Sequence, residues 1–329
     1  MKKTILLPVF FLLMAVSADA QFNAVYLDHI GLYNSLSIDS ASGLIVIGRA
    51  AHADYMRNEK QLQIKGTRAF IQKNPDVILT YTGVSDYAGM LYVYSFEGEL
   101  KEEIPFKGVI SALTATPGQH VVYLTVNTKI DALSSESAVY SFDISTRQVR
   151  LVFLSGVYEL TSISLLQGNR LGISGTQMNY IILLDGKVIK EIPAPHRSFS
   201  KANRQHNLFM ILQEFSDGSI LEFYNADGEK LRTIDYKHKK KPFQGTRRCR
   251  ECKTKNASFE DYDLSPDQQL LLARDQYNQV FVLDEHIKLK MSFEDSQDWC
   301  FLTWVSNTEF MYLDKKTNEI KRKTLQKQQ

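Results

Sequence analysis

The sequence predicts an all-β fold, specifically a β-propeller of seven four-stranded blades, and three observations lead to it. From residue 21 onward, apolar residues alternate at period two or form short runs between Gly, Asn, Asp and Ser, which is typical of strands joined by turns. One hairpin motif also recurs along the chain. Its turns at Gly98, Thr146, Gly186 and Gly228 are 48, 40 and 42 residues apart, the spacing of units with four short strands.

The recurring hairpin consists of an aromatic or β-branched strand, a turn that carries Asp or Gly, and a strand that mixes charged and aliphatic residues. Its clearest copies span 91–105, 181–193 and 221–234, with weaker copies at 138–149 and 280–291. Each unit also begins with a strand pair of its own, and the two pairs together make one blade. The predicted blades are 35–66, 69–107, 110–155, 160–193, 198–236, 259–294 and 299–325.

The two ends of the repeat region suggest how the ring closes. The last unit supplies three strands, one fewer than a blade needs, whereas segment 22–27 is a strand without a hairpin partner. We expect this N-terminal strand to pair as the outer strand of the last blade, which would remove two exposed sheet edges. Six or eight blades remain alternatives, because the hairpin of the first unit, around Asn58 and Glu59, is faint.

The N-terminus carries an export signal. Lys2 and Lys3 precede an apolar run at 5–16, and Ala18-Asp19-Ala20 provides a small-residue cleavage site. We expect residues 1–20 to be a cleaved signal peptide and 21–329 to form a single propeller domain in the periplasm or outside the cell. An uncleaved N-terminal anchor is the alternative. No later apolar run reaches the length of a membrane span, so none is expected in the mature chain.

Composition excludes several classes of protein. Of the 329 residues, 44% are hydrophobic, which is too many for a disordered chain. The formal net charge of +2 lacks the strongly basic balance of most nucleic-acid-binding domains, so no nucleic-acid partner is expected.

A basic insertion at about 237–258 separates the fifth and sixth predicted blades. Between Tyr236 and Phe259 it holds nine Lys or Arg residues and a single Glu. A long loop between blades projects from one face of the ring, and its local positive potential favours an acidic protein or peptide partner. A solvated loop whose charge only adds solubility is the alternative. The candidate binding residues are Lys239, Lys240, Lys241, Arg247, Arg248 and Arg250.

The insertion also contains a CxxC pair, Cys249 and Cys252. In an oxidising compartment we expect these two to form a local disulfide, although a bond from either of them to Cys300 is a possible pairing as well. Attached haem would need a histidine next in the sequence, and a zinc site would need further ligands. We expect Cys300 to be buried beside Trp299 and Trp304.

The sequence holds no catalytic constellation and implies no cofactor or metal. The carboxylates between Glu260 and Asp295 fall at turns and blade openings, where such groups usually accept backbone N–H bonds. His196 and His206 flank the opening of the fifth blade without metal-like spacing. Nucleophile elbows, phosphate-binding glycine loops and zinc-protease helices are missing from the sequence.

Several stretches resemble a known repeat group. Residues 263–273 resemble the SPDG-type opening of WD40-like and YVTN-type bacterial propeller repeats, and 279–284 resemble the strand that follows it. Residues 115–123 with 139–143 are similar. The Trp-Asp dipeptide of strict WD40 repeats is absent, and Tyr123 to Asn127 only approximate a YVTN motif. The resemblance implies the propeller fold and leaves activity open, because the group contains scaffolds, lactonase-like enzymes and amine dehydrogenase subunits.

The function expected from the sequence is a secreted, non-catalytic scaffold that binds a protein or peptide partner through one face. The alternative is an enzyme or enzyme subunit, either a lactonase-like metal-dependent hydrolase or the propeller subunit of a periplasmic amine dehydrogenase-type oxidoreductase.

Overall fold

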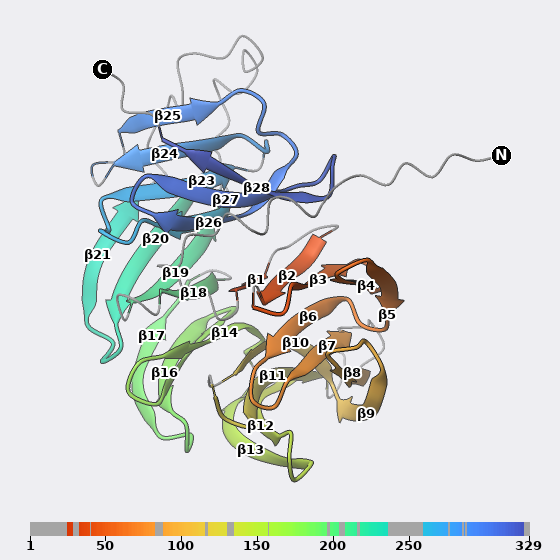
Figure 1. Cartoon of the computed structure of the whole chain (residues 1–329). Helices are drawn as coiled ribbons and strands as arrows, with labels where there is room; N and C mark the ends of the chain where they lie inside the picture. Colours follow the sequence, from red (N-terminus) through yellow and green to blue (C-terminus); the bar gives the residue numbers. More distant parts are fainter. Residues whose placement is uncertain are drawn as a thin grey trace, which may run out of the picture.

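The computed structural model describes residues 25–28, 33–39, 41–82, 88–115, 118–129, 135–156, 158–195, 198–203, 208–215, 218–235, 259–275, 277–284, 286 and 288–325. Within these ranges every regular element is a strand, and the strands form seven antiparallel sheets. Figure 1 shows the sheets following one another around a ring in chain order, from red to blue.

The first three blades lie in the N-terminal half. Blade 1 contains β1 (Val25–Asp28), β2 (Tyr33–Asp39), β3 (Leu44–Arg49), β4 (Ala53–Arg57) and β5 (Lys60–Ile64). Blade 2 contains β6 (Arg68–Gln72), β7 (Val77–Thr82), β8 (Ala88–Ser95) and β9 (Leu100–Lys107). Blade 3 contains β10 (Val109–Ala115), β11 (Val121–Lys129), β12 (Ser135–Asp143) and β13 (Gln148–Gly156).

The other four blades complete the ring. Blade 4 contains β14 (Leu160–Leu166), β15 (Arg170–Gly175), β16 (Met178–Leu183) and β17 (Val188–Pro193). Blade 5 contains β18 (Ser198–Asn203), β19 (Leu208–Phe215), β20 (Gly218–Asn225) and β21 (Lys230–Asp235). Blade 6 contains β22 (Phe259–Leu264), β23 (Leu270–Asp275), β24 (Val280–Asp284) and β25 (Leu289–Phe293). Blade 7 contains β26 (Trp299–Ser306), β27 (Glu309–Asp314) and β28 (Glu319–Thr324).

The seven predicted blades are confirmed, and their limits agree with the sheets to within a few residues, except that the first sheet begins at Val25. Among the described residues the first sheet has five strands and the last has three, whereas four were predicted for each. The predicted role of the N-terminal strand is wrong. β1 pairs antiparallel with β2, Val25 opposite Ile38, and so lies in the first sheet rather than at the outer edge of the last. Only four residues separate the two strands, and a short connection favours pairing between neighbours in the sequence.

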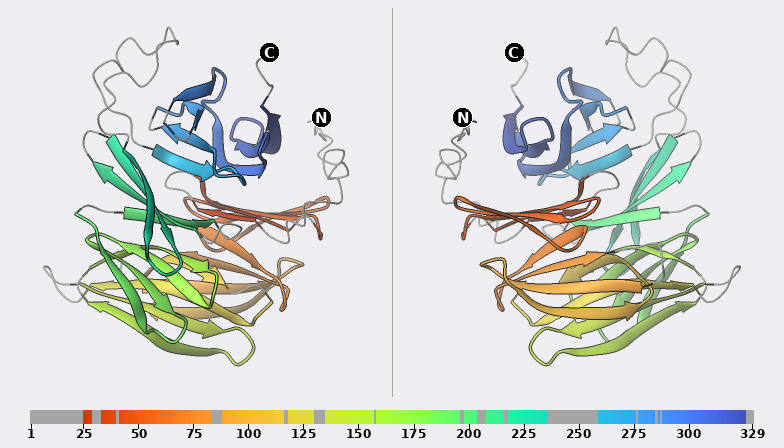
Figure 2. Two further views of the ribbon diagram at one scale, coloured as in Figure 1. Left: turned by 90° about the vertical axis from the view of Figure 1, so that its left-hand side faces the viewer. Right: turned by 90° about the vertical axis from the view of Figure 1, so that its right-hand side faces the viewer.

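Apolar side chains join each blade to the next. In the described part of the chain, each of seven buried clusters combines residues of two successive blades. The smallest cluster joins the last blade to the first through Leu36, Ile47, Cys300, Phe301 and Leu313. Figure 2 shows the blue seventh blade beside the red-orange first blade. Side-chain packing, rather than a shared strand, therefore connects the two ends of the ring.

The glycines of the recurring hairpin turn have a packing role. Gly98, Gly186 and Gly228 have φ values of +82°, +92° and +80°, a region that residues with a Cβ rarely adopt. Each turn also lies against the outer strand of the preceding blade. The closest approach is at Gly186, where a Cβ would lie 1.9 Å from the carbonyl oxygen of Val152 on β13. The motif that revealed the repeat is thus a contact between neighbouring blades.

Candidate functional site

All the binding residues predicted in the basic insertion lie outside the described residues. These are Lys239, Lys240, Lys241, Arg247, Arg248 and Arg250, together with Cys249 and Cys252. His196 and His206 lie outside the described residues as well. The structure does describe the two strands between which the insertion runs, β21 ending at Asp235 and β22 beginning at Phe259.

The end of the insertion is firmly anchored. The Phe259 side chain is fully buried and lies 6.0 Å from Phe281, centroid to centroid. Its backbone N–H donates to the hydroxyl of Ser219 in blade 5, at 3.1 Å. Phe259 thus belongs to the core shared by blades 5 and 6, and the chain leaves the insertion at a fixed point.

The turn between β23 and β24 lies beside this anchor, because Phe259 and Asp275 are opposite each other in the sheet. Arg274 is buried at the end of β23 and forms an ion pair with Glu260, at 3.0 Å. Its guanidinium also donates to the Asn278 side chain at 3.2 Å and to the carbonyl of Trp299 at 3.3 Å. These bonds hold the turn against blade 7.

Tyr277 sits in this turn and is 38% exposed. An aromatic side chain on a braced turn can anchor a partner, since it offers a large contact area at low entropic cost. Sequence reasoning missed Tyr277. The sequence did contain one indication, because Tyr277 is an isolated aromatic residue in the polar turn that follows Ala273-Arg274-Asp275.

The carboxylate of Asp275 stabilises this turn through hydrogen bonds. It is buried and accepts the N–H groups of Tyr277 and Gln279, each at 2.9 Å. Burial raises the pKa of Asp275 to about 6, from an ordinary 3.8. The folded protein therefore binds this proton more tightly than the unfolded chain does, and stability falls as the pH rises from about 4 to about 6.

Asp275→Asn is expected to remove this pH dependence. Because the amide stays neutral, the variant should be more stable than the wild type above pH 6, by about 3 kcal/mol, and the difference should shrink towards pH 4. Urea unfolding across this pH range measures the difference. A difference that does not change with pH would contradict the assignment.

Two further carboxylates of blade 6 bond to neighbouring blades. Asp261 forms an ion pair with Lys201 of blade 5 at 2.9 Å and accepts the N–H of Leu302 of blade 7 at 2.8 Å. Asp263 accepts the N–H of Trp304 at 2.8 Å. The expectation that these acidic residues accept backbone N–H bonds is confirmed for both. Within the described ranges, no group of three or more His, Cys, Asp or Glu residues is placed to hold a metal ion.

Cys300 is buried, as predicted, but its neighbours differ from those expected. It packs with Phe301 between blades 7 and 1, whereas Trp299 and Trp304 pack between blades 6 and 7. Adjacent strand residues usually point to opposite faces of a sheet, which separates Cys300 from Trp299. The register shift between Cys300 and Thr303 interrupts this alternation and brings Phe301 to the side of Cys300. Cys300 is a free thiol, and burial raises its pKa to about 12, so it stays protonated. No disulfide is found among the described residues, which do not include Cys249 and Cys252.

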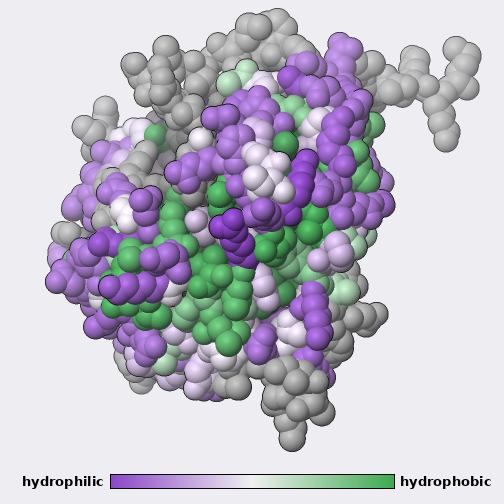
Figure 3. Space-filling model, turned by 90° about the horizontal axis from the view of Figure 1, so that it is seen from below, coloured by the Kyte–Doolittle hydropathy of each residue, from purple (hydrophilic) through white to green (hydrophobic). Residues whose placement is uncertain are grey.

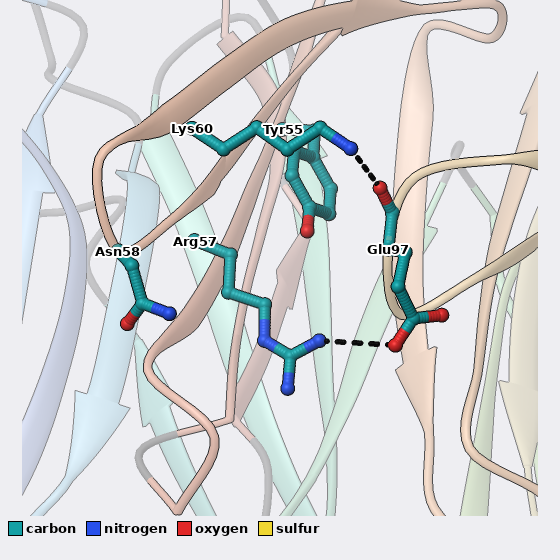
Figure 4. A pocket seen from close by; sticks show the side chains of 5 residues that line it. All are labelled: Tyr55, Arg57, Asn58, Lys60 and Glu97. Carbon is teal, nitrogen blue, oxygen red and sulfur yellow. Dashed lines mark hydrogen bonds and ion pairs between the residues drawn. The ribbon is translucent and has the colours of Figure 1, made fainter.

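A pocket of about 240 Å³ lies between the outer hairpin of blade 1 and the β8–β9 turn of blade 2 (Figure 4). Its lining groups largely bond to one another. The Tyr55 hydroxyl donates to the carbonyl of Phe96 at 2.7 Å, and Arg57 lies 3.4 Å from the Glu97 carboxylate. Ligand pockets are usually larger than this, so we interpret this one as a joint between blades.

Apolar residues are exposed along the outer strands. Figure 3, which views the molecule of Figure 1 from below, shows apolar residues gathered among hydrophilic ones. On β13, Val149, Leu151 and Leu154 are all exposed, with Leu151 at 57%. The opposing residues of β12 place these three side chains on the same face of the sheet, the face towards blade 2.

The solved structures that resemble this chain include three propellers. The Cps50 (Swd1) β-propeller domain of Myceliophteria thermophila matches with a TM-score of 0.62 and 11% identity, over 92% of this chain and 98% of that one. Sqt1 of Saccharomyces cerevisiae matches with a TM-score of 0.54 and 11% identity, over 91% and 87% of the two chains. Raptor of Chaetomium thermophilum matches with a TM-score of 0.58 and 9% identity, over 88% of this chain and 27% of that one.

This chain has the WD40-like propeller fold. The resemblance inferred from its SPDG-type repeats is confirmed at the level of fold, and identities this low support nothing finer. Neither the known protein-family models nor the curated protein sequences gave a match. A membrane-spanning helix is not found within the described ranges, where every element is a strand.

Proposed function

We propose that this propeller is a secreted scaffold that binds an acidic protein or peptide without catalysing a reaction, and that the basic insertion at 237–258 is the contact. The observation that carries the proposal is that nine cationic residues lie in the sequence between β21 and β22, strands of two neighbouring blades. A scaffold that is already ordered loses little entropy on binding, and local positive potential accelerates encounter with an acidic segment.

The turn beside the insertion supports this proposal. Tyr277 is exposed within a turn held by Asp275 and Arg274, next to the point where the insertion rejoins blade 6. An aromatic residue beside a cationic loop is a combination that interface cores favour, because Tyr and Arg are enriched there. We infer that the partner covers both the insertion and this turn.

Replacing Lys239, Lys240, Lys241, Arg247 and Arg248 by Glu is expected to abolish capture of the partner from the native envelope fraction. The new charges should repel an acidic partner and slow its association. The matched control reverses Lys101, Lys107, Lys187, Lys190 and Lys288, exposed cations of outer strands and turns, and should leave capture unchanged. Quantitative mass spectrometry of the captured fraction reports the result. Equal capture by wild type and insertion variant would contradict the proposal.

The same preparation tests the enzyme alternative. Stoichiometric calcium or zinc in the purified chain, or a melting temperature lowered by a chelator, would favour a metal-dependent hydrolase over a scaffold.

Export is part of the proposal. The mature protein is expected to begin at Gln21, because the small residues Ala18 and Ala20 fit signal-peptidase recognition. The intact mass of protein purified from its native compartment should then lack residues 1–20. A mass that includes them would leave the uncleaved anchor as the better account.

A further inference from the structure

The outer edge of blade 7 differs from that of every other blade. Among the described residues, the sheets of blades 2 to 6 have four strands each and that of blade 1 has five, whereas blade 7 has three. In the other blades the third strand of the blade pairs on both sides. β28 holds the corresponding position in blade 7, and among the described residues it pairs only with β27.

The hydrogen-bond pattern shows which groups of β28 face this edge. Leu325 donates to the carbonyl of Thr308 at 2.7 Å, which makes 325 and 308 a hydrogen-bonded pair. Bonded and non-bonded pairs alternate along an antiparallel ladder, so Lys321 and Lys323 also bond to β27. Ile320, Arg322 and Thr324 therefore direct their N–H and C=O groups outward.

β28 also differs from the other third strands in composition and burial. The third strands β16 and β24 are mainly buried and apolar, and each pairs with a fourth strand. β28 contains no fully buried residue and carries three successive cations, Lys321, Arg322 and Lys323. Within the ranges that the structure describes, its outer backbone groups therefore have no strand partner, and they lie at a charged edge.

The charge indicates what could pair there. The hairpin from Glu309 to Thr324 contains five basic and three acidic residues, a net charge of 5 − 3 = +2. Lys321 and Arg322 form ion pairs with Asp314 and Glu309, at 2.7 Å and 3.7 Å. Lys323 is exposed and, within the described part of the chain, forms no ion pair with a carboxylate.

Pairing of this edge with the same edge of a second copy would bring like charges together, as would pairing with the basic insertion. Charged residues, lysine above all, protect sheet edges from unselective pairing in this way. The same charges favour a strand of opposite sign.

We propose that the outer edge of β28 accepts an extended acidic segment of a partner protein as the fourth strand of blade 7. Backbone groups of Ile320, Arg322 and Thr324 would bond to the incoming strand, and Lys321, Arg322 and Lys323 would select for carboxylates beside it. Because the cations alternate between the two faces of the strand, acidic residues on either face of the partner segment would meet one. The proposal does not depend on the insertion.

A short acetylated peptide in which valine and glutamate alternate, labelled with a fluorophore, tests the proposal by anisotropy with the full mature chain. Thr324→Pro removes an outward N–H and keeps every cation and every bond to β27, and it should weaken binding about ten-fold or more. Lys323→Glu should weaken binding as well. Lys107→Glu, on the outer strand of blade 2, is the matched control and should bind like the wild type.

Three further results are expected. Methylation of the peptide's backbone nitrogens should weaken binding, a peptide with lysine in place of glutamate should not bind, and bound peptide should slow hydrogen exchange in β28. The insertion variant with its five charges reversed should still bind this peptide, which separates failure of this proposal from failure of the proposed function.

Other outcomes would overturn the inference. These are no binding by the wild type, binding that ignores both Thr324→Pro and backbone methylation, or a Thr324→Pro protein that melts well below the wild type without peptide. The last result would mean that a segment of this chain or of a second copy already occupies the edge. Sedimentation velocity then shows whether the protein is a monomer or a dimer, and so which of the two segments is bound.

Discussion

Gly186→Ala is expected to lower the free energy of unfolding by about 3 kcal/mol. Two effects add at this position. A residue with a Cβ is strained at a φ of +92°, and the new methyl group would lie 1.9 Å from the carbonyl oxygen of Val152, so that the blade 4 turn must move away from β13. Urea unfolding followed by tryptophan fluorescence measures the loss.

Gly156→Ala is the matched control. Gly156 has a φ of +76°, but a Cβ there would meet nothing within 4 Å, so only backbone strain remains. The expected loss is about 1 kcal/mol. Equal losses at the two positions would show that the approach of the turn to the preceding blade does not matter.

Asp261→Ala is expected to destabilise the protein by about 3 kcal/mol. The side chain of Asp261 is almost fully buried, and its removal leaves the Lys201 amine without its carboxylate and the Leu302 N–H without its acceptor. A buried ion pair broken on one side leaves an uncompensated charge, although partial exposure of Lys201 moderates the cost.

A second variant separates the charge from the packing. Lys201→Met combined with Asp261→Leu removes both charges of the pair and is expected to cost less than Asp261→Ala alone, because neither partner is left behind. Asp263, which Lys201 also stabilises, keeps its bonds from Thr303 and Trp304. Asp185→Ala, at an exposed turn, should cost about 1 kcal/mol or less. Thermal unfolding of the four proteins at one pH compares these losses. A double variant less stable than Asp261→Ala would contradict this explanation.

The blade pattern could be predicted because it is local. Each outer hairpin has a turn residue, an apolar strand and a charged strand within about fifteen residues, and strand alternation at period two then fixes which residues are buried. The recurrence of this hairpin predicted the blade limits even where the turn contains no glycine, as in the turn at Thr146.

The two predictions that failed concerned the partner of the first strand and the neighbours of Cys300. Segment 22–27 had no hairpin partner in the predicted pattern, and it was assigned to blade 7 because that blade needed a fourth strand. In the structure β1 pairs with β2 instead, across the short connection from Asp28 to Tyr33. The neighbours of Cys300 were predicted wrongly because closeness in sequence to Trp299 says nothing about the face on which a strand residue lies.

The candidate site was only partly accessible from the sequence. Charge density identified the insertion, and the turn aspartates were expected to bond backbone groups. The hydrogen bonds that hold the Tyr277 turn could not be predicted from the sequence, because one of them runs from Arg274 to the carbonyl of Trp299 in the next blade. Contacts between blades arise from the closed ring rather than from any local pattern.

Zero-length cross-linking of the complex captured from the native envelope fraction tests the proposed function most directly, since a carbodiimide joins amines only to carboxylates in contact. We expect Lys239, Lys240 and Lys241 to be joined to acidic residues of the partner, and these links to disappear at high salt. A captured partner whose cross-links all lie on other surfaces of the propeller would contradict the proposal.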